Sequence, residues 1–333
     1  MSVEMDAVQK AVDLASRSGA DDADAWLSMG RSFNITVLND EVEQLEEADS
    51  RVLGLRVFIG QRSALVYSSD LSEDALADLA GQAIELAKLS GEDRWTSLPE
   101  ESFANDSDAA DLDLYDPEMF ARDPKILIER ALRAEAASRG HDPKITNSEG
   151  ATVSRQEGTI ALANSRGFAS SYRSSSCSLS ASAVVDDADY KKRVGRWQTS
   201  DRFFGKLEDA EMVGQTAARR AMGRLGARRV RTQAVPVVWS PEMGCLFLYL
   251  LSVAVSGEMR FQGSSFLIDR EGETLGSPLL TIVDDATLPG RLLAALRRRR
   301  ACLSADAALR GGKLQRLSLR QLQRPARRAR EHG

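Results

Sequence analysis

Histidine and cysteine are scarce in this chain of 333 residues, which contains two histidines and three cysteines. His141 lies in the loop sequence SRGHDPK, where a lone histidine is usually solvated rather than bound to a metal ion. The cysteines Cys177, Cys245 and Cys302 are far apart, so they form neither a metal-binding spacing nor a disulfide framework. The sequence therefore argues against a histidine and cysteine metal site, and it predicts a reducing, cytoplasmic location.

Long apolar runs are also missing. The most apolar segment, residues 243–255 (MGCLFLYLLSVAV), would be about 20 Å long as a helix, whereas the hydrocarbon core of a membrane is about 30 Å thick. We therefore predict no membrane association and interpret this segment as a buried helix that begins at Ser240 and Pro241. The first residues, MSVEMDAVQKAVDLA, show the apolar periodicity of an amphipathic helix and not that of a secretion signal.

The charge is distributed unevenly along the chain. Residues 291–333 contain twelve arginines and one lysine against two acidic residues, and they include no aromatic residue. The preceding 290 residues contain 31 basic and 47 acidic residues, a net charge of −16. We predict that the arginine-rich stretch is disordered. Clustered arginine can bind phosphate, but an acidic body repels it, so nucleic acid is an unfavoured partner.

Apolar patterning predicts a multi-domain α+β protein. An N-terminal strand and helix domain covers residues 1–92, with strand alternation at Phe33, Ile35 and Val37 and a helix that begins at Ser72. An acidic linker covers residues 93–122.

The central domain covers residues 123–228, where antiparallel hairpins are flanked by helices. Asp123 and Pro124 open the first of these helices, and Gly140 ends it. The start of an incomplete, β-rich C-terminal domain follows at residues 234–290, and residues 291–333 form the arginine-rich tail.

Five segments resemble the TldD/PmbA family. They are GLRVFIGQRSALVYSSDLSEDAL, ITNSEGATVSR, ANSRGFASSYRSSSCSLSASAV, GSSFLIDREGE and LLTIVDDATLPG, which together lie between Gly54 and Gly290. The resemblance implies a cytosolic two-subunit peptidase, in which a TldD-type subunit carries zinc and a PmbA-type (TldE-like) subunit pairs with it.

The resemblance also indicates which type this chain is. The TldD type has an HExxxH motif at a fixed distance before GSS, and counting back from Gly263 places its histidines on Leu248 and Val253 and its glutamate on Tyr249. Zinc needs imidazole, thiolate or carboxylate ligands, and hydrolysis also needs a base. We therefore predict a PmbA-type chain with no catalytic, metal-binding or cofactor-binding residue and no cofactor of its own, the zinc being in the partner.

The resemblance to TldD/PmbA sequences ends at Gly290, and we expect a frameshift in the coding sequence at this point. If ALRRRRA has suitable codons, reading one base later gives PFDDEG, which resembles the family's continuation after its LPG turn. The same shift turns QRLSLRQLQRPARR into SAFLFDSYSARRA, again similar to family text. The expectation is a C-terminally truncated chain, unstable because the strands that would complete the third domain are absent.

Two other groups of residues resemble catalytic sites. The run SSSCSLSASA, Ser174 to Ala183, lacks the base and orienting partner that a serine nucleophile needs, so we interpret it as hydroxyl side chains facing solvent on a strand. Asp284 and Asp285 are adjacent, and adjacent strand residues point to opposite faces, so a turn is the preferred interpretation.

Three functions follow. The first is a non-catalytic PmbA/TldE-like subunit that pairs with a TldD-like zinc subunit in the proteolysis of peptides. The second is a metallopeptidase that is active alone through ligands not recognised in the sequence. The third is a non-enzymatic regulator linked to DNA gyrase or nucleic acid, because the family has also been connected with gyrase.

Overall fold

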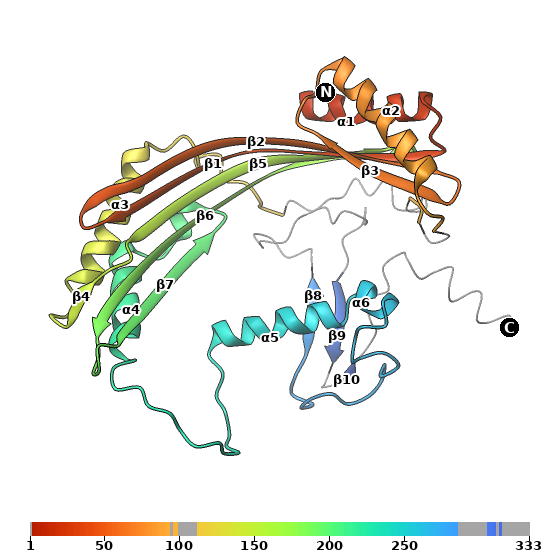
Figure 1. The fold of residues 1–333 in the computed structure, drawn as a ribbon. Helices are drawn as coiled ribbons and strands as arrows, with labels where there is room; N and C mark the ends of the chain where they lie inside the picture. Colours follow the sequence, from red (N-terminus) through yellow and green to blue (C-terminus); the bar gives the residue numbers. More distant parts are fainter. Residues whose placement is uncertain (1, 94–95, 99–111, 286–304, 311–312, 315–333) are drawn as a thin grey trace.

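One long, curved antiparallel sheet dominates the protein (Figure 1). The computed structural model describes residues 2–93, 96–98, 112–285, 305–310 and 313–314. The sheet has seven strands in the order β3-β2-β1-β5-β6-β4, with β7 paired to β6. Their bounds are β1 Asp22–Leu38, β2 Glu41–Ile59, β3 Arg62–Ser68, β4 Ile145–Asn147, β5 Ala151–Asn164, β6 Ala169–Asp186 and β7 Lys192–Asp201.

The two predicted N-terminal units share this sheet. Strand β1 pairs with β2 on one side, and on the other it pairs with β5 from Asp24 opposite Asn164 to Val37 opposite Ala151. A continuous ladder of hydrogen bonds thus runs from residues of the predicted first domain to residues of the predicted central domain. The α+β fold with antiparallel hairpins is confirmed, and the domain boundaries stay a prediction.

The helices begin where the sequence indicates. Ser72 and Asp123 accept hydrogen bonds from backbone N–H groups in the first turns of their helices, which satisfies donors that have no partner within the helix. The helices are α1 Val3–Arg17, α2 Glu73–Leu89, α3 Pro124–Arg139, α4 Ala210–Met222, α5 Pro241–Ala254 and α6 Gly257–Phe261, with a short 3₁₀ turn at Phe204–Lys206.

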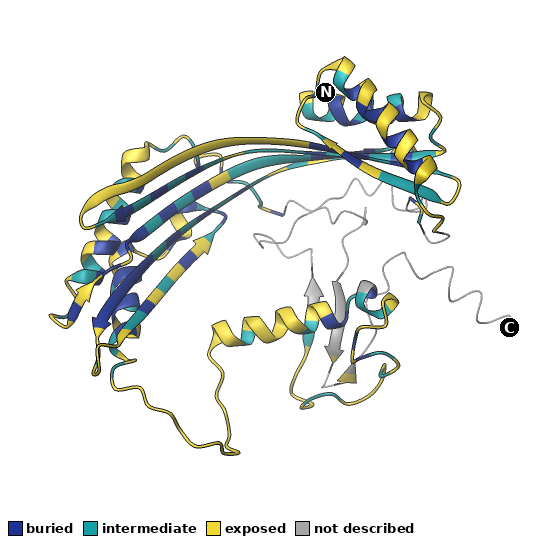
Figure 2. Cartoon of the chain, in the orientation of Figure 1, coloured by how far each residue is buried: buried dark blue, intermediate teal, exposed yellow. Residues whose placement is uncertain are grey.

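The helices α1 to α4 cover two ends of one face of the sheet. The odd-numbered residues of β1 point to this face, where Leu27 is buried under α1 and α2 and Ile35 is buried with residues of α3 and α4. Figure 2 shows these two buried regions as dark blue segments separated along the strands. The helix-bearing face therefore carries two hydrophobic cores, one under α1 and α2 and one under α3 and α4, with a gap between them. The opposite face is concave, and none of these four helices lies on it.

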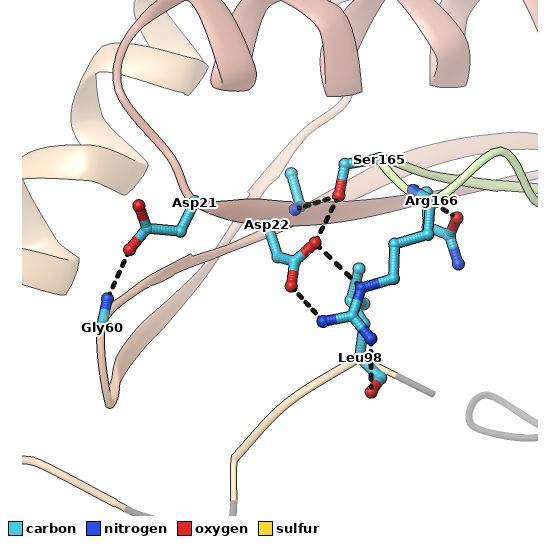
Figure 3. A network of polar contacts seen from close by, with 8 residues as sticks. Asp21, Asp22, Gly60, Leu98, Ser165 and Arg166 are labelled. Atoms are coloured by element: carbon cyan, nitrogen blue, oxygen red, sulfur yellow. Dashed lines mark hydrogen bonds and ion pairs between the residues drawn. The ribbon is translucent and has the colours of Figure 1, made fainter. Parts of the chain in front are cut away.

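Polar contacts fix the ends of the strands (Figure 3). Asp22, at the start of β1, accepts hydrogen bonds from Arg166 and from the Ser165 hydroxyl, at 3.1 and 2.9 Å respectively. The Ser165 hydroxyl in turn accepts from the Ala23 N–H at 3.0 Å, while Asp21 accepts from the Gly60 N–H at 2.7 Å. The β5–β6 turn and the β2–β3 turn are thereby held at the start of β1.

The predicted linker, residues 93–122, is partly ordered against the sheet. The Leu114 carbonyl accepts from the Ser175 N–H at 3.0 Å, and the Asp116 N–H donates to the Ser175 hydroxyl at 2.8 Å. Met119 is fully buried in the core under α3 and α4. The edge of β6 beyond the end of β7 offers backbone hydrogen-bonding groups, and this segment satisfies them.

Two short strands lie within the arginine-rich stretch. Strand β8 is Ile282–Asp285, and β9 (Ala305–Arg310) pairs with it, followed by β10 (Lys313–Leu314). The expected absence of regular structure is therefore wrong for the residues of β9 and β10, because the open edge of β8 offers a ladder of hydrogen bonds to them. The junction at Gly290 and the remaining residues of the stretch lie outside the described residues.

Candidate functional site

The helix α5 contains the positions that the sequence predicts to correspond to the zinc motif of the TldD type. Its first turn is anchored by Ser240, whose hydroxyl accepts from the Met243 N–H at 3.4 Å. Glu242 pairs with Arg220 of α4. Hydrogen bonds from Ser240, from its own N–H and from Arg220 lower the pKa of Glu242 to about 2, so the carboxylate is ionised and ties α5 to α4. The predicted start of this helix is confirmed.

The three motif positions present side chains that are not metal ligands. Leu248, Tyr249 and Val253 are 48, 63 and 38% exposed. Two of these side chains are aliphatic, and no imidazole or carboxylate accompanies the Tyr249 phenol at the positions where the motif requires them. A water molecule here would have neither a metal ion to lower its pKa nor a carboxylate to take its proton. These three side chains therefore do not supply the ligands or the base that the motif provides.

The prediction that α5 is buried is wrong for this structure. Of its fourteen residues Ala254 alone is buried, and Phe247 and Leu250 are 44 and 53% exposed. Trp239 packs edge-on against Phe247, with ring centroids 4.6 Å apart. The sequence specifies a helix that is apolar on all sides, and such a helix normally lies inside a protein. Within the described residues, however, few side chains pack against α5.

An exposed apolar helix should cause self-association. We expect the double substitution of Phe247 and Leu250 to lysine to lower the associated fraction of the full chain by about two-fold or more, since contiguous exposed apolar surface promotes association. Light scattering and sedimentation velocity measure this fraction. Leu89→Lys is the matched control, because Leu89 is 84% exposed at the end of a different helix, α2. A wild-type chain that stays monodisperse at high concentration would contradict this expectation.

The remaining candidate ligands are dispersed. Among the described residues, no three or more His, Cys, Asp or Glu side chains lie together in a way that could hold a metal ion. His141 is exposed, as the sequence predicts, and Cys245 is also exposed. Cys177 is buried, and burial raises the pKa of its thiol to about 12, so it is not a thiolate. Cys302 lies outside the described residues.

The serine run lies on β6 and serves two structural purposes. Ser175 and Ser182 are buried and bonded to backbone groups, so the prediction that the run faces solvent is wrong for them. The even-numbered serines from Ser174 to Ser180 are half-buried on the concave face. Hydroxyl and amide side chains bond across the strands there, in the pairs Thr36–Thr152 (3.1 Å), Ser154–Ser178 (2.7 Å) and Gln156–Ser176 (2.6 Å). The run is thus part of a sheet face on which hydroxyl and amide side chains form rows across the strands, with charged residues such as Glu46 and the Asp24–Arg56 pair on the same face.

The paired aspartates lie in a strand and not in the expected turn. Asp284 and Asp285 end β8, opposite Asp306 and Ala305 of β9. The sequence favours a turn because two adjacent residues of a strand point to opposite faces and would not share a site, but the strand partner that decides the conformation, β9, lies about twenty residues further along the chain. The prediction that this chain has no catalytic or metal-binding residue stays a prediction.

No membrane-spanning helix is found in the described part of the chain, because none there is long and apolar enough to cross a bilayer. Helix α5, the most apolar segment, has fourteen residues.

Family models match three consecutive parts of the chain. They are described as the PmbA/TldA metallopeptidase domain 1 (residues 23–87), central domain (119–225) and C-terminal domain (232–296). The fold and these matches define a protease-related protein of mixed α and β structure.

Named relatives support the same assignment. The chain is 32% identical over 272 residues to the metalloprotease PmbA homolog of Haemophilus influenzae and 31% identical over 283 residues to metalloprotease PmbA of Escherichia coli O157:H7. It is 22% identical over 293 residues to the metalloprotease TldD homolog of H. influenzae. The chain belongs to the PmbA/TldD family. These matches cover 80, 83 and 84% of the chain but 58, 60 and 58% of the respective relatives, so it spans about three fifths of their length.

Two crystal structures share the fold. A protein from Bacteroides thetaiotaomicron described as a modulator of DNA gyrase superimposes with a TM-score of 0.88 at 22% identity, covering 95% of this chain and 72% of that one. TldE from Thermococcus kodakarensis gives a TM-score of 0.75 at 17% identity, covering 93 and 69%. At these identities the likeness shows the fold alone.

Proposed function

We propose that this chain is a PmbA/TldE-like non-catalytic subunit, which pairs with a zinc-bearing TldD-like subunit in the proteolysis of peptides. The observation that carries the proposal is the set of side chains at Leu248, Tyr249 and Val253 on α5, which cannot bind zinc. The greater identity to PmbA proteins than to the TldD homolog of the same bacterium supports the PmbA type.

The exposure of α5 fits a role in assembly. A helix that is apolar all round and exposed in one chain offers contact area with aromatic and leucine side chains, the residue types that dominate stable interfaces. The concave face, by contrast, carries rows of hydroxyl and amide groups. Such groups can hydrogen-bond to peptide main chains, which supports a peptide-handling role.

The test compares the full chain alone with the chain co-expressed with a TldD-type subunit. We expect the purified chain to contain less than about 0.1 zinc ion per molecule and to leave peptides intact, since its zinc-binding positions lack ligands. The co-purified pair should contain zinc and hydrolyse peptides. Elemental analysis and chromatographic peptide assays measure both quantities. Stoichiometric zinc together with hydrolysis by the chain alone would overturn the proposal, as would failure of the two subunits to co-purify.

A further inference from the structure

The gap between the two helix pairs contains a cavity of about 830 Å³. Along β1, the residues that point to the helix-bearing face are apolar and buried up to Leu27 and again from Phe33 onward. Between them stand Met29 and Arg31, neither of which is buried. The interrupted alternation is the sequence signal for this opening, and neither pair of helices covers it.

Three arginines line the cavity. They are Arg31 of β1, Arg51 of β2 and Arg173 of β6, accompanied by the acidic side chains of Asp49 and Glu157. Arg31 pairs with Glu157 at 2.8 Å, so those two charges neutralise each other. The lining therefore has an excess of one positive charge, although the body of the chain is strongly acidic.

Arg51 and Arg173 are held by neutral groups. The Arg51 Nε donates to the Ser69 carbonyl at 2.7 Å. Arg173 stacks on the Tyr115 ring, 3.8 Å from its centroid, and donates to the Tyr115 hydroxyl. Within the described ranges, no carboxylate lies within 4.0 Å of either guanidinium nitrogen set. Each guanidinium is thus positioned by a neutral group and forms no ion pair within 4.0 Å. Arg51 still has an acidic neighbour, because hydrogen bonds from Ser72 and, to a smaller extent, the charge of Arg51 lower the pKa of the exposed Asp70 carboxylate.

The two arginines share one row of the sheet. The register places Arg51 opposite Met29, Met29 opposite Thr159, and Thr159 opposite Arg173, so two uncharged residues separate them. Three strand spacings correspond to about 14 Å between the outer Cα atoms, and an arginine side chain extends about half that distance. Both guanidinium groups can therefore approach a ligand held over Met29 and Thr159.

The Tyr115 hydroxyl is part of the same arrangement. It donates to Glu157 at 3.1 Å, and burial followed by this hydrogen bond to a carboxylate raises the pKa of Tyr115. The phenol therefore remains neutral and keeps Arg173 in place without pairing with its charge. The position of Arg173 is therefore fixed through a chain of contacts: it stacks on Tyr115, Tyr115 donates to Glu157, and Glu157 pairs with Arg31.

We infer that this cavity binds the oxyanion group, carboxylate or phosphate, of a small molecule between Arg51 and Arg173. Guanidinium groups recognise both kinds of oxyanion through paired N–H donors, and positioned arginines lose less freedom on binding. Asp49 and the acidic edge of β2 oppose the anion, so weak affinity is expected, with half-saturation at about 1–10 mM. The site lies on the helix-bearing face and is independent of the proposed subunit role.

The experiment titrates the full chain with inorganic phosphate and, separately, with N-acetylglycine at constant ionic strength, using calorimetry or amide chemical shifts. We expect saturable binding that weakens at least five-fold in Arg51→Gln and in Arg173→Gln, because each removes one of two charge-assisted contacts. Arg62→Gln is the matched control, since Arg62 is a partly exposed arginine of the same sheet outside the cavity, and it should bind as the wild type does. Unfolding midpoints verify that the variants are folded.

The two titrations distinguish a carboxylate site from a phosphate site. Binding of N-acetylglycine alone assigns the site to carboxylates, binding of phosphate alone assigns it to phosphates, and binding of both supports the shared chemistry. If Arg173→Gln fails to fold, Arg173→Lys, which retains the positive charge, should bind more tightly than Arg51→Gln. Absence of saturable binding of either probe up to about 50 mM, or unchanged affinity in the folded glutamine variants, overturns the inference.

Discussion

Replacing Gly214 by alanine should lower the free energy of unfolding by about 2–3 kcal/mol, although Gly-to-Ala in a helix interior normally stabilises by about 1 kcal/mol. Gly214 lies in α4 where this helix crosses α3. An added Cβ atom would lie 2.1 Å from the Ala134 carbonyl oxygen and 2.8 Å from the Ser138 nitrogen. Because these are backbone atoms of α3, no side-chain rotation relieves the overlap, and the two helices must separate.

Gly81→Ala is the matched control for this substitution. Gly81 lies inside α2, and no atom lies within 4 Å of the position that its Cβ would take. Here helix propensity acts without steric opposition, so we expect stabilisation of up to about 1 kcal/mol. Denaturant unfolding followed by circular dichroism measures both variants. If Gly214→Ala were as stabilising as Gly81→Ala, the close packing of α3 on α4 in this structure would be incorrect.

The second large effect is expected for Glu135→Ala, which should cost about 2–4 kcal/mol of stability. Glu135 lies on α3, is fully buried, and accepts hydrogen bonds from the N–H groups of Asn39 and Asp40 at 2.8 and 3.0 Å. Those residues form the β1–β2 turn, and both have positive φ angles, 55° and 66°. Hydrogen bonds to a charged group contribute about 1.5–3 kcal/mol each, and because these two share one carboxyl group and one turn their contributions overlap, so the expected loss is smaller than their sum.

Glu129→Ala tests whether the effect is specific to this position. Glu129 is an exposed glutamate on the same helix, so its replacement should change stability by less than about 0.5 kcal/mol. Glu135→Gln should fall between the two alanine variants, because the amide retains one acceptor oxygen. Equal, small effects at both positions would show that the turn does not depend on the Glu135 carboxylate.

Short-range features of the fold could be predicted from the sequence. The caps at Ser72, Asp123 and Ser240 and the buried alternation at Phe33, Ile35 and Val37 are all found in the structure. These features depend on a residue and its immediate neighbours, so local physics is enough to place them.

Features that depend on distant partners could not be predicted. Ser175 and Ser182 looked solvent-facing because a small polar residue on a strand usually is, but their hydroxyls bond to a distant turn and to the segment before α3. Arg155 gives no signal in the sequence, yet it is buried, stacks over the Phe33 and Phe120 rings and donates to the carbonyls of Met119 and Arg122. Such contacts join residues that are far apart in the sequence and meet only in the tertiary structure.

The sequence by itself determined the family and the α+β class, and it predicts that Leu248, Tyr249 and Val253 stand at the zinc-binding positions of the TldD type, because residue identity at a motif position does not depend on packing. The tertiary structure alone decided that both N-terminal units share one sheet, that α5 is exposed and that Arg51 and Arg173 face one cavity. Strand order and register are set by pairing between residues more than a hundred positions apart, as between β1 and β5, and neither periodicity nor composition records which strands pair.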